Sequence, residues 1–287
     1  MGKTKQSKRV WCLVLILAIV TSILQFQTSA LEVNAAEEKY YPIEYGQDVK
    51  IGNYYYRIDV DTNNFQNILQ RKKAGAKKYE TIIKNIYGKC FATAKKIYYV
   101  TYQNNNDASY STLYQCNMDG KKKKKIAKVK ENIELGAVYN GKFYVSAGNE
   151  WDGYTTYTIT KDGKLKLEKK ELRVYRGSGQ YMVGSVAEPT DVSPSPLCIY
   201  NAKTKKKIKL GAGLAPRIIK KKVYYASFDY KKGCYSIKSC NVNGKKQKTI
   251  ATLPKNCIYV SYVCDKYVFY QTMDSEGNLE EGTKLEY

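Results

Sequence analysis

The polar run GNEWDGY (148–154) holds residue types that could bind a ligand. Trp151 is the only tryptophan after residue 35, and it stands between Asn149 and Asp152. An indole in a polar loop can stack on a sugar ring or anchor a protein partner, or it can fold back over its own sheet. We expect a protein or glycan as the ligand. Two other loops carry weaker candidates of the same kind, namely Asp107 in NNNDAS and Asp229 and Tyr230 in SFDYKKG.

Enzymatic chemistry is restricted because histidine is absent from all 287 residues. The commonest general base is therefore missing, which excludes Ser-His, Cys-His and His-zinc sites. Carboxylates and tyrosines remain, so a carbohydrate-active hydrolase or lyase is the alternative to a binding module. Neither VDTNN (60–64) nor NNNDAS (104–109) matches the twelve-residue calcium loop. We predict a non-enzymatic protein with no catalytic residue, no metal site and no cofactor, while Ca²⁺ binding stays open.

Two lysine runs form a second candidate site, this one for a polyanion. They consist of Lys121, Lys122, Lys123, Lys124, Lys125, Lys205, Lys206 and Lys207. The first run follows Asp119 and Gly120 in TLYQCNMDGKKKKKIAKV (112–129), a pattern typical of a β-hairpin. Such a run can bind anionic polymers, or it can only keep a hairpin tip soluble. We predict no nucleic-acid binding, because the runs lack the aromatic residues on which single-stranded bases stack.

Residues 1–35 are predicted to be a secretory signal peptide. Four bases precede the apolar run VWCLVLILAIV (10–20), and small residues occur at TSA (28–30) and VNA (33–35). About 15 apolar residues are fewer than the roughly 20 that span a bilayer, so we expect cleavage after Ala35 rather than an anchor helix. Without the four bases and one acid of this segment, the 49 basic and 26 acidic residues leave a net charge of +20. The mature protein is then secreted, basic and not integral to the membrane.

A repeat of about 43 residues runs through residues 36–287. KKIYYV (95–100) returns as NGKFYV (140–145), KKVYYA (221–226) and DKYVFY (265–270). Four short strands at this period, without helical periodicity, are typical of a β-propeller blade. We predict an all-β, six-bladed β-propeller of four-stranded antiparallel blades, with seven blades or two β domains as alternatives. The copies cover about 46–85, 86–130, 131–170, 171–212, 213–255 and 256–287.

The sixth copy is short, so the N-terminal run KYYPIEY (39–45) is expected to supply its missing strand and close the ring. Aligning the central position of the repeat pairs an apolar or aromatic residue in every copy. These residues are Tyr56, Tyr99, Tyr144, Val183, Tyr225 and Tyr270. Cys116 and Cys240 share another repeat position with Ile159 and Tyr200, so we expect a buried apolar slot there and no disulfide between the two thiols.

The repeat unit resembles a known group of propellers. LYQCNMDGKKKKKIAKV (113–129) and YSIKSCNVNGKKQKTIATL (235–253) are similar to secreted bacterial six-bladed propellers of the TolB-like and low-density-lipoprotein-receptor-like kind, in particular those grouped as DUF5050. The resemblance covers the mature chain and implies the fold, without a catalytic residue. The YWTD tetrapeptide of the receptor propellers is absent, so no receptor-type ligand is inferred.

Propeller topology divides the charged residues between two faces. The turns between the third and fourth strands of the blades share one face and are rich in lysine: KAGAKK (73–78), MDGKKK (118–123), KDGKLK (161–166), AKTKKK (202–207) and VNGKKQ (242–247). The acidic loops, including the one with Trp151, lie on the other face. We predict an exported binding module of the cell surface, which the lysines hold to anionic wall polymers. A structural propeller inside a larger surface assembly is a third class.

Overall fold

The computed structural model describes residues 39–45, 47–105, 108–149, 153–160, 162–186, 195–280 and 282–287. The predicted signal peptide, residues 1–35, lies outside these ranges. Residues Tyr40–Tyr287 form one compact unit. The described residues form 22 strands and no helix, and consequently none of their segments is a helix long and apolar enough to cross a membrane.

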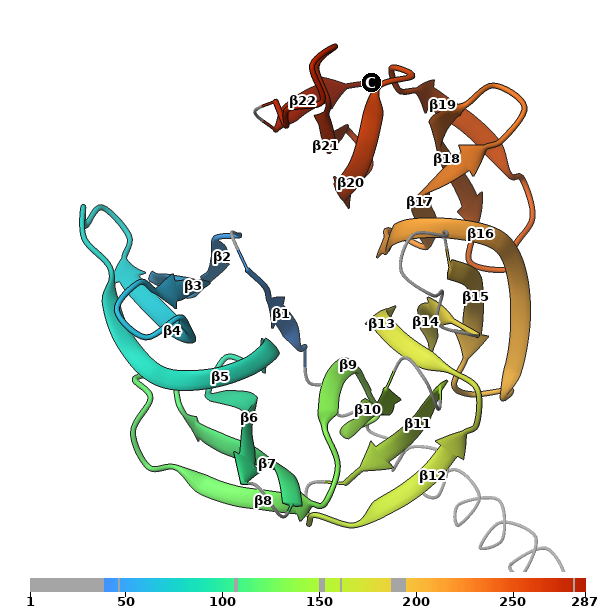
Figure 1. Cartoon of the computed structure of the whole chain (residues 1–287). Coiled ribbons are helices and arrows are strands. Elements are labelled where there is room, and N and C mark those ends of the chain that lie inside the picture. Colours follow the sequence, from blue (N-terminus) through green and yellow to red (C-terminus); the bar gives the residue numbers. More distant parts are fainter. Residues whose placement is uncertain are drawn as a thin grey trace, which may run out of the picture. The chain divides into compact units, whose positions relative to one another are not determined.

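The strands form four antiparallel sheets, which divide into six blades around the short strand β1 because β5 joins two blades and β16 joins two others (Figure 1). Blade 1 consists of β2 (Val49–Ile51), β3 (Tyr54–Asp61), β4 (Gln66–Lys73) and the first part of β5 (Glu80–Ala92). Blade 2 consists of the second part of β5, β6 (Lys96–Asn105), β7 (Ala108–Asn117) and β8 (Lys124–Val129).

Blades 3 and 4 continue the same antiparallel order. Blade 3 consists of β9 (Ile133–Tyr139), β10 (Lys142–Asn149), β11 (Gly153–Ile159) and β12 (Leu165–Lys169). Blade 4 consists of β13 (Arg173–Ser178), β14 (Tyr181–Ser185), β15 (Ser195–Asn201) and the first part of β16 (Lys206–Ile219). Like β5, β16 bends from the outer edge of one blade to the inner edge of the next, so one strand serves two sheets.

Blade 5 consists of the second part of β16, β17 (Lys222–Asp229), β18 (Cys234–Asn241) and β19 (Lys248–Thr252). Blade 6 has three strands, β20 (Cys257–Val263), β21 (Tyr267–Thr272) and β22 (Thr283–Glu286). The predicted fold class, an all-β six-bladed propeller, is confirmed.

The predicted closure by the N-terminal strand is wrong. β1 (Tyr41–Ile43) does not join blade 6 but pairs with β5 at the inner edge of blade 2, where Ile43 lies opposite Cys90. The reason is burial: the side chain of Ile43 is fully buried in the apolar cluster between blades 1 and 2.

The repeat positions behave as the sequence predicts. The aligned residues Tyr56, Tyr99, Tyr144, Val183, Tyr225 and Tyr270 are all buried. The second slot keeps a common register, since Cys116 lies opposite Ile97 and Cys240 lies opposite Val223 in the neighbouring strand. Both cysteines are buried and free, so the prediction of core thiols is confirmed.

Five buried apolar clusters join successive blades, from the pair 1 and 2 to the pair 5 and 6. No such cluster joins blade 6 to blade 1 within the described ranges. The outward face of blade 6 instead carries Tyr262, Tyr267 and Phe269 in mutual ring contact, and Phe269 is 37% exposed. The ring therefore has one seam that apolar packing does not hold together.

Candidate functional site

Part of the predicted loop site falls outside the described residues, namely Asp107, Trp151 and Asp152. Asn149 ends β10, where it lies opposite Gly153. Asp229 ends β17, and its Oδ1 accepts hydrogen bonds from the backbone N–H groups of Lys231 (3.1 Å) and Lys232 (3.3 Å). Asp229 thus caps its own turn, which is the ordinary role of aspartate in a tight loop.

Tyr230 is the described residue of this loop that is best placed for recognition. Its side chain is 72% exposed, and its ring meets Phe228 edge to face at 5.1 Å between ring centroids. An aromatic ring that is supported on one side and open on the other suits stacking on a ligand.

The predicted lysine site lies on hairpin turns that share one backbone geometry. In blade 2, Gly120 N–H donates to the carbonyl of Asn117 (3.0 Å), and Asn117 N–H donates to that of Lys121 (2.9 Å). Blade 5 repeats both bonds at Gly244 and Lys245, at 2.8 and 2.9 Å. The lysine after the glycine is therefore fixed in the same place on different blades.

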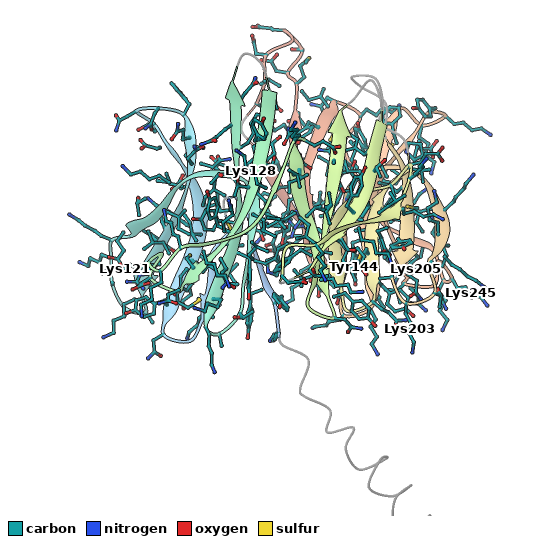
Figure 2. All side chains as sticks on the ribbon, turned by 90° about the horizontal axis from the view of Figure 1, so that it is seen from below. Lys121, Lys128, Tyr144, Lys203, Lys205 and Lys245 are labelled. Atoms are coloured by element: carbon teal, nitrogen blue, oxygen red, sulfur yellow. The ribbon has the colours of Figure 1, made fainter. Side chains whose placement is uncertain are left out.

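These turns present their lysines on the same side of the molecule. Lys121, Lys203, Lys205 and Lys245 lie in the lower half of Figure 2, whereas Lys128 of β8 lies nearer the opposite side. Lys121 to Lys125 are exposed. The other run is partly compensated, because Lys205 forms an ion pair with Glu168, and Lys207 is half-buried.

A third group of charged residues, which the sequence analysis missed, lies at the centre of the ring. It consists of Glu44, directly after β1, and of side chains from the innermost strands of four blades: Lys89, Glu134, Arg173, Arg176 and Arg217. The innermost strands face the axis of a propeller, so their side chains meet there although they are far apart in the sequence. We call this group the channel cluster.

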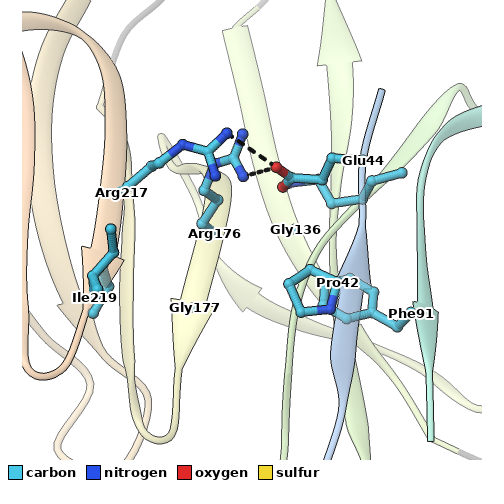
Figure 3. A pocket seen from close by; sticks show the side chains of 10 residues that line it. Pro42, Glu44, Phe91, Gly136, Arg176, Gly177, Arg217 and Ile219 are labelled. Atoms are coloured by element: carbon cyan, nitrogen blue, oxygen red, sulfur yellow. Dashed lines mark hydrogen bonds and ion pairs between the residues drawn. The ribbon is translucent and has the colours of Figure 1, made fainter. Parts of the chain in front are cut away.

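Glu44 is the centre of the channel cluster (Figure 3). Arg176 and Arg217 both donate to its Oε2, the latter at 3.2 Å, and Lys89 Nζ lies 3.8 Å from its Oε1. Only 10% of the Glu44 side chain is exposed. Burial alone would raise the pKa of this carboxyl, but the three cations outweigh that effect and lower the pKa below its ordinary value.

The rest of the channel cluster is also paired. Arg173 holds Glu134 at 3.0 Å, and Lys89 Nζ donates to the backbone carbonyl of Tyr175. Burial lowers the pKa of Lys89 to about 8, against the opposing attraction of Glu44. Arg217 also stacks on Tyr262 of blade 6, with its guanidinium 3.7 Å from the ring centroid.

Two cavities adjoin the channel cluster, and both are lined by Lys89 and Arg176. One, of about 90 Å³, is also lined by Glu44 and Arg217; the other, of about 360 Å³, is also lined by Glu134. Oε1 of Glu44 is buried and accepts no hydrogen bond from the described residues. Those residues include no group of three Cys, Asp or Glu side chains that could hold a metal ion. The arrangement suits an anion better than a cation.

A signal for the channel cluster was present in the sequence. Arginine occurs at only six positions, so the other 43 of the 49 basic residues are lysine, and three of the six arginines are Arg173, Arg176 and Arg217. In a chain that uses lysine for its surface, arginine at three positions in inner strands indicates paired charges.

No protein-family model matches the chain, and no curated protein matches it. Solved structures do match. TolB from Acinetobacter baumannii is 10% identical, with a TM-score of 0.51 over 83% of this chain and 65% of that one. A prolyl endopeptidase is 11% identical, with a TM-score of 0.58 over 85% of this chain and 43% of that one. The chain thus spans less than two thirds of either.

An oligogalacturonate lyase in complex with manganese is 9% identical, with a TM-score of 0.55 over 86% of this chain and 77% of that one. At such identities the likeness shows the fold alone. The chain shares the β-propeller fold with these proteins. Some of them are enzymes by name, so the likeness does not decide between catalysis and binding.

Proposed function

We propose that the protein is an exported, non-enzymatic binding module that its lysine-bearing turns hold to anionic polymers of the cell surface. One observation carries the proposal: the hairpin-turn lysines of blades 2, 4 and 5 gather on the same side of the propeller (Figure 2). A surface with one sign of charge attracts a polyanion over a distance comparable to the Debye length.

The turn geometry supports this proposal further. Lys121 N–H donates to Oδ1 of Asp119 (3.0 Å), and Lys245 N–H donates to Oδ1 of Asn243 (3.0 Å). Each of these residues thus binds the turn through its backbone, while its ammonium group extends into solvent. Ordered attachment points with exposed, flexible-chain ammonium groups suit a polymer of repeating charge more than a single shaped ligand.

Sedimentation with purified cell wall tests the proposal. The protein is mixed with intact wall, and with wall stripped of its anionic polymers, across a salt series. We expect retention at low salt that is lost with added salt and with stripping. Equal retention on both walls, or no retention at any salt, would refute the proposal.

A matched pair of variants locates the binding face. Lys121→Gln with Lys122→Gln removes two charges from the turn of blade 2, and Lys231→Gln with Lys232→Gln removes two from the β17–β18 loop at the other end of the strands. A lysine near an anionic surface contributes about 1 kcal/mol, so the first pair should weaken retention at least about tenfold. The second pair should leave it nearly unchanged.

A further inference from the structure

We propose that the channel cluster is a second binding site, which takes the carboxylate group of a small acidic ligand into the cavity of about 360 Å³. The ligand carboxylate contacts Lys89 and Arg176, which line this cavity together with Glu134. This site is independent of the lysines on the hairpin turns.

The charge balance of the cluster favours an added anion. Lys89, Arg176 and Arg217 carry three positive charges around the one negative charge of Glu44. Arg217 is only 12% exposed and Lys89 only 19%. Cations that are largely removed from water and incompletely balanced are costly. One bound carboxylate reduces the surplus from two charges to one.

These cations already bind one carboxylate, that of Glu44, so their geometry suits a carboxylate ligand. Its Oε2 is held by guanidinium groups from blades 4 and 5, and its Oε1 faces the ammonium group of blade 2. A guanidinium has five N–H donors and an ammonium has three. Arg176 and Lys89 can therefore hold a second carboxylate while they keep Glu44.

The lining of the larger cavity also indicates the chemistry of the ligand beyond its carboxylate. The larger cavity is lined by Leu197, Leu214 and Pro216 in addition to the charged residues, so it offers an apolar wall to the body of the ligand. Its volume lies at the small end of typical ligand sites. Glu134 can accept a hydrogen bond from a hydroxyl or amide group of the ligand. A sugar acid or the carboxyl end of a short peptide has this chemistry.

Calorimetric titration with two matched pairs of probes tests the proposal and distinguishes a sugar acid from the carboxyl end of a peptide. The first pair is D-galacturonate and D-galactose, and the second is N-acetyl-alanine and its amide. Within each pair, only the first compound has a carboxylate. We expect at least one carboxylate to bind at least about tenfold more tightly than its neutral partner. If neither pair shows a difference up to about 10 mM, the proposal is wrong.

Three single substitutions test whether the carboxylate binds at the channel cluster. Two of them remove one positive charge each, and the third removes one negative charge. Lys89→Gln should weaken binding at least about tenfold, whereas Lys121→Gln, which removes the same charge from a hairpin turn, should leave it unchanged. Glu44→Gln removes the internal carboxylate that competes for the cations, so binding should tighten about tenfold. Near-ultraviolet circular dichroism verifies that each variant is folded. Equal binding by the Lys89→Gln and Lys121→Gln variants would overturn the assignment. These titrations do not depend on whether the protein sediments with the cell wall.

Discussion

Arg217 on β16 donates a 3.2 Å hydrogen bond to Oε2 of Glu44, a residue 173 positions earlier in the chain. The same oxygen accepts from Arg176 on β13. The backbone of β1 meanwhile pairs with β5. The N-terminal strand is thus fixed to blade 2 through its backbone and to blades 4 and 5 through one carboxylate. It links opposite parts of the ring across the centre.

Neutralising Glu44 should therefore destabilise the whole propeller. In Glu44→Gln, three partly buried cations lose their shared counter-ion, and such a loss costs about 3 kcal/mol of the free energy of unfolding. Urea unfolding followed by circular dichroism measures the change. Glu286→Gln is the control, because Glu286 forms an exposed ion pair with Lys284 on β22 and should leave the unfolding midpoint unchanged. Equal effects of the two substitutions would contradict the role of Glu44.

Lys89 should give the protein a characteristic pH dependence. Its pKa falls from an ordinary value of 10.5 to about 8 in the folded state, chiefly through burial. At a pH between these values the unfolded chain retains a proton that the folded protein has lost, so stability rises with pH there. Below about pH 8 both states are protonated, and burying the charge has its full cost.

The measurement compares wild type with Lys89→Met between about pH 7 and pH 9, below the range in which most tyrosines ionise. The free energy of unfolding of wild type, relative to that of the variant, should increase by about 1 kcal/mol from pH 8 to pH 9. Lys124→Met, on the exposed part of the lysine run, serves as the control. If wild type and Lys89→Met show the same pH profile, Lys89 is not the group responsible.

The fold was accessible from the sequence because it rests on local patterns that recur. The aligned residues from Tyr56 to Tyr270 and the slot shared by Cys116 and Cys240 each report burial in their own blade. The position of β1 was not accessible. Several blades have an unpaired strand edge with which β1 could pair. It pairs with β5 because Ile43 is buried there while Glu44 reaches its arginine partners.

The channel cluster was missed for a related reason. Arg176, Arg217 and Lys89 stand in three different copies of the repeat, and no spacing in the sequence links them. Only the circular arrangement of the blades brings their side chains together around Glu44. The lysine turns, by contrast, were found because each lies within one hairpin. A turn within one hairpin can be predicted from the sequence alone, whereas a site built from four blades can be recognised only from the arrangement of the blades in the structure.

Thiol chemistry provides a third prediction. Burial raises the pKa of Cys116, Cys198 and Cys257 to about 11, and all seven cysteines of the described chain are buried and free. The thiolate is the reactive form, so the folded protein should react slowly with Ellman's reagent at pH 8 and rapidly in denaturant. Since these pKa values are raised on folding, stability is lost as the pH rises from about 9 through 11. Fast labelling of the native protein would show that the cysteines are accessible.

The conformation of the glycine in the hairpin turn explains why the Asp-Gly-Lys unit recurs. It also provides a test of the seam between blade 6 and blade 1. Gly120 has a φ of +77°, and a Cβ built on it would lie 2.3 Å from the carbonyl oxygen of Ile82 in blade 1. Gly163 has the same relation to Ile126 of blade 2, at 2.1 Å. The turns of blades 2 and 3 thus pack on the outer strand of the blade before them. Gly75 lies in the corresponding turn of blade 1 but one position earlier, because there Ala76 N–H donates to the carbonyl three residues before it, that of Lys73 (2.9 Å). Gly75 has a φ of +87°, and nothing lies within 4 Å of its Cβ position.

Gly120→Ala and Gly75→Ala should therefore differ although both residues have positive φ. Each substitution costs about 1 kcal/mol for the left-handed backbone, and Gly120→Ala adds about 2 kcal/mol because the blades must separate to accommodate the methyl group. Urea unfolding of both variants, followed by circular dichroism, measures the difference. Comparable large losses would mean that blade 6 packs against the Gly75 turn in solution and that the ring is closed there. A small loss at Gly75 alone would show that blade 1 is free on that side.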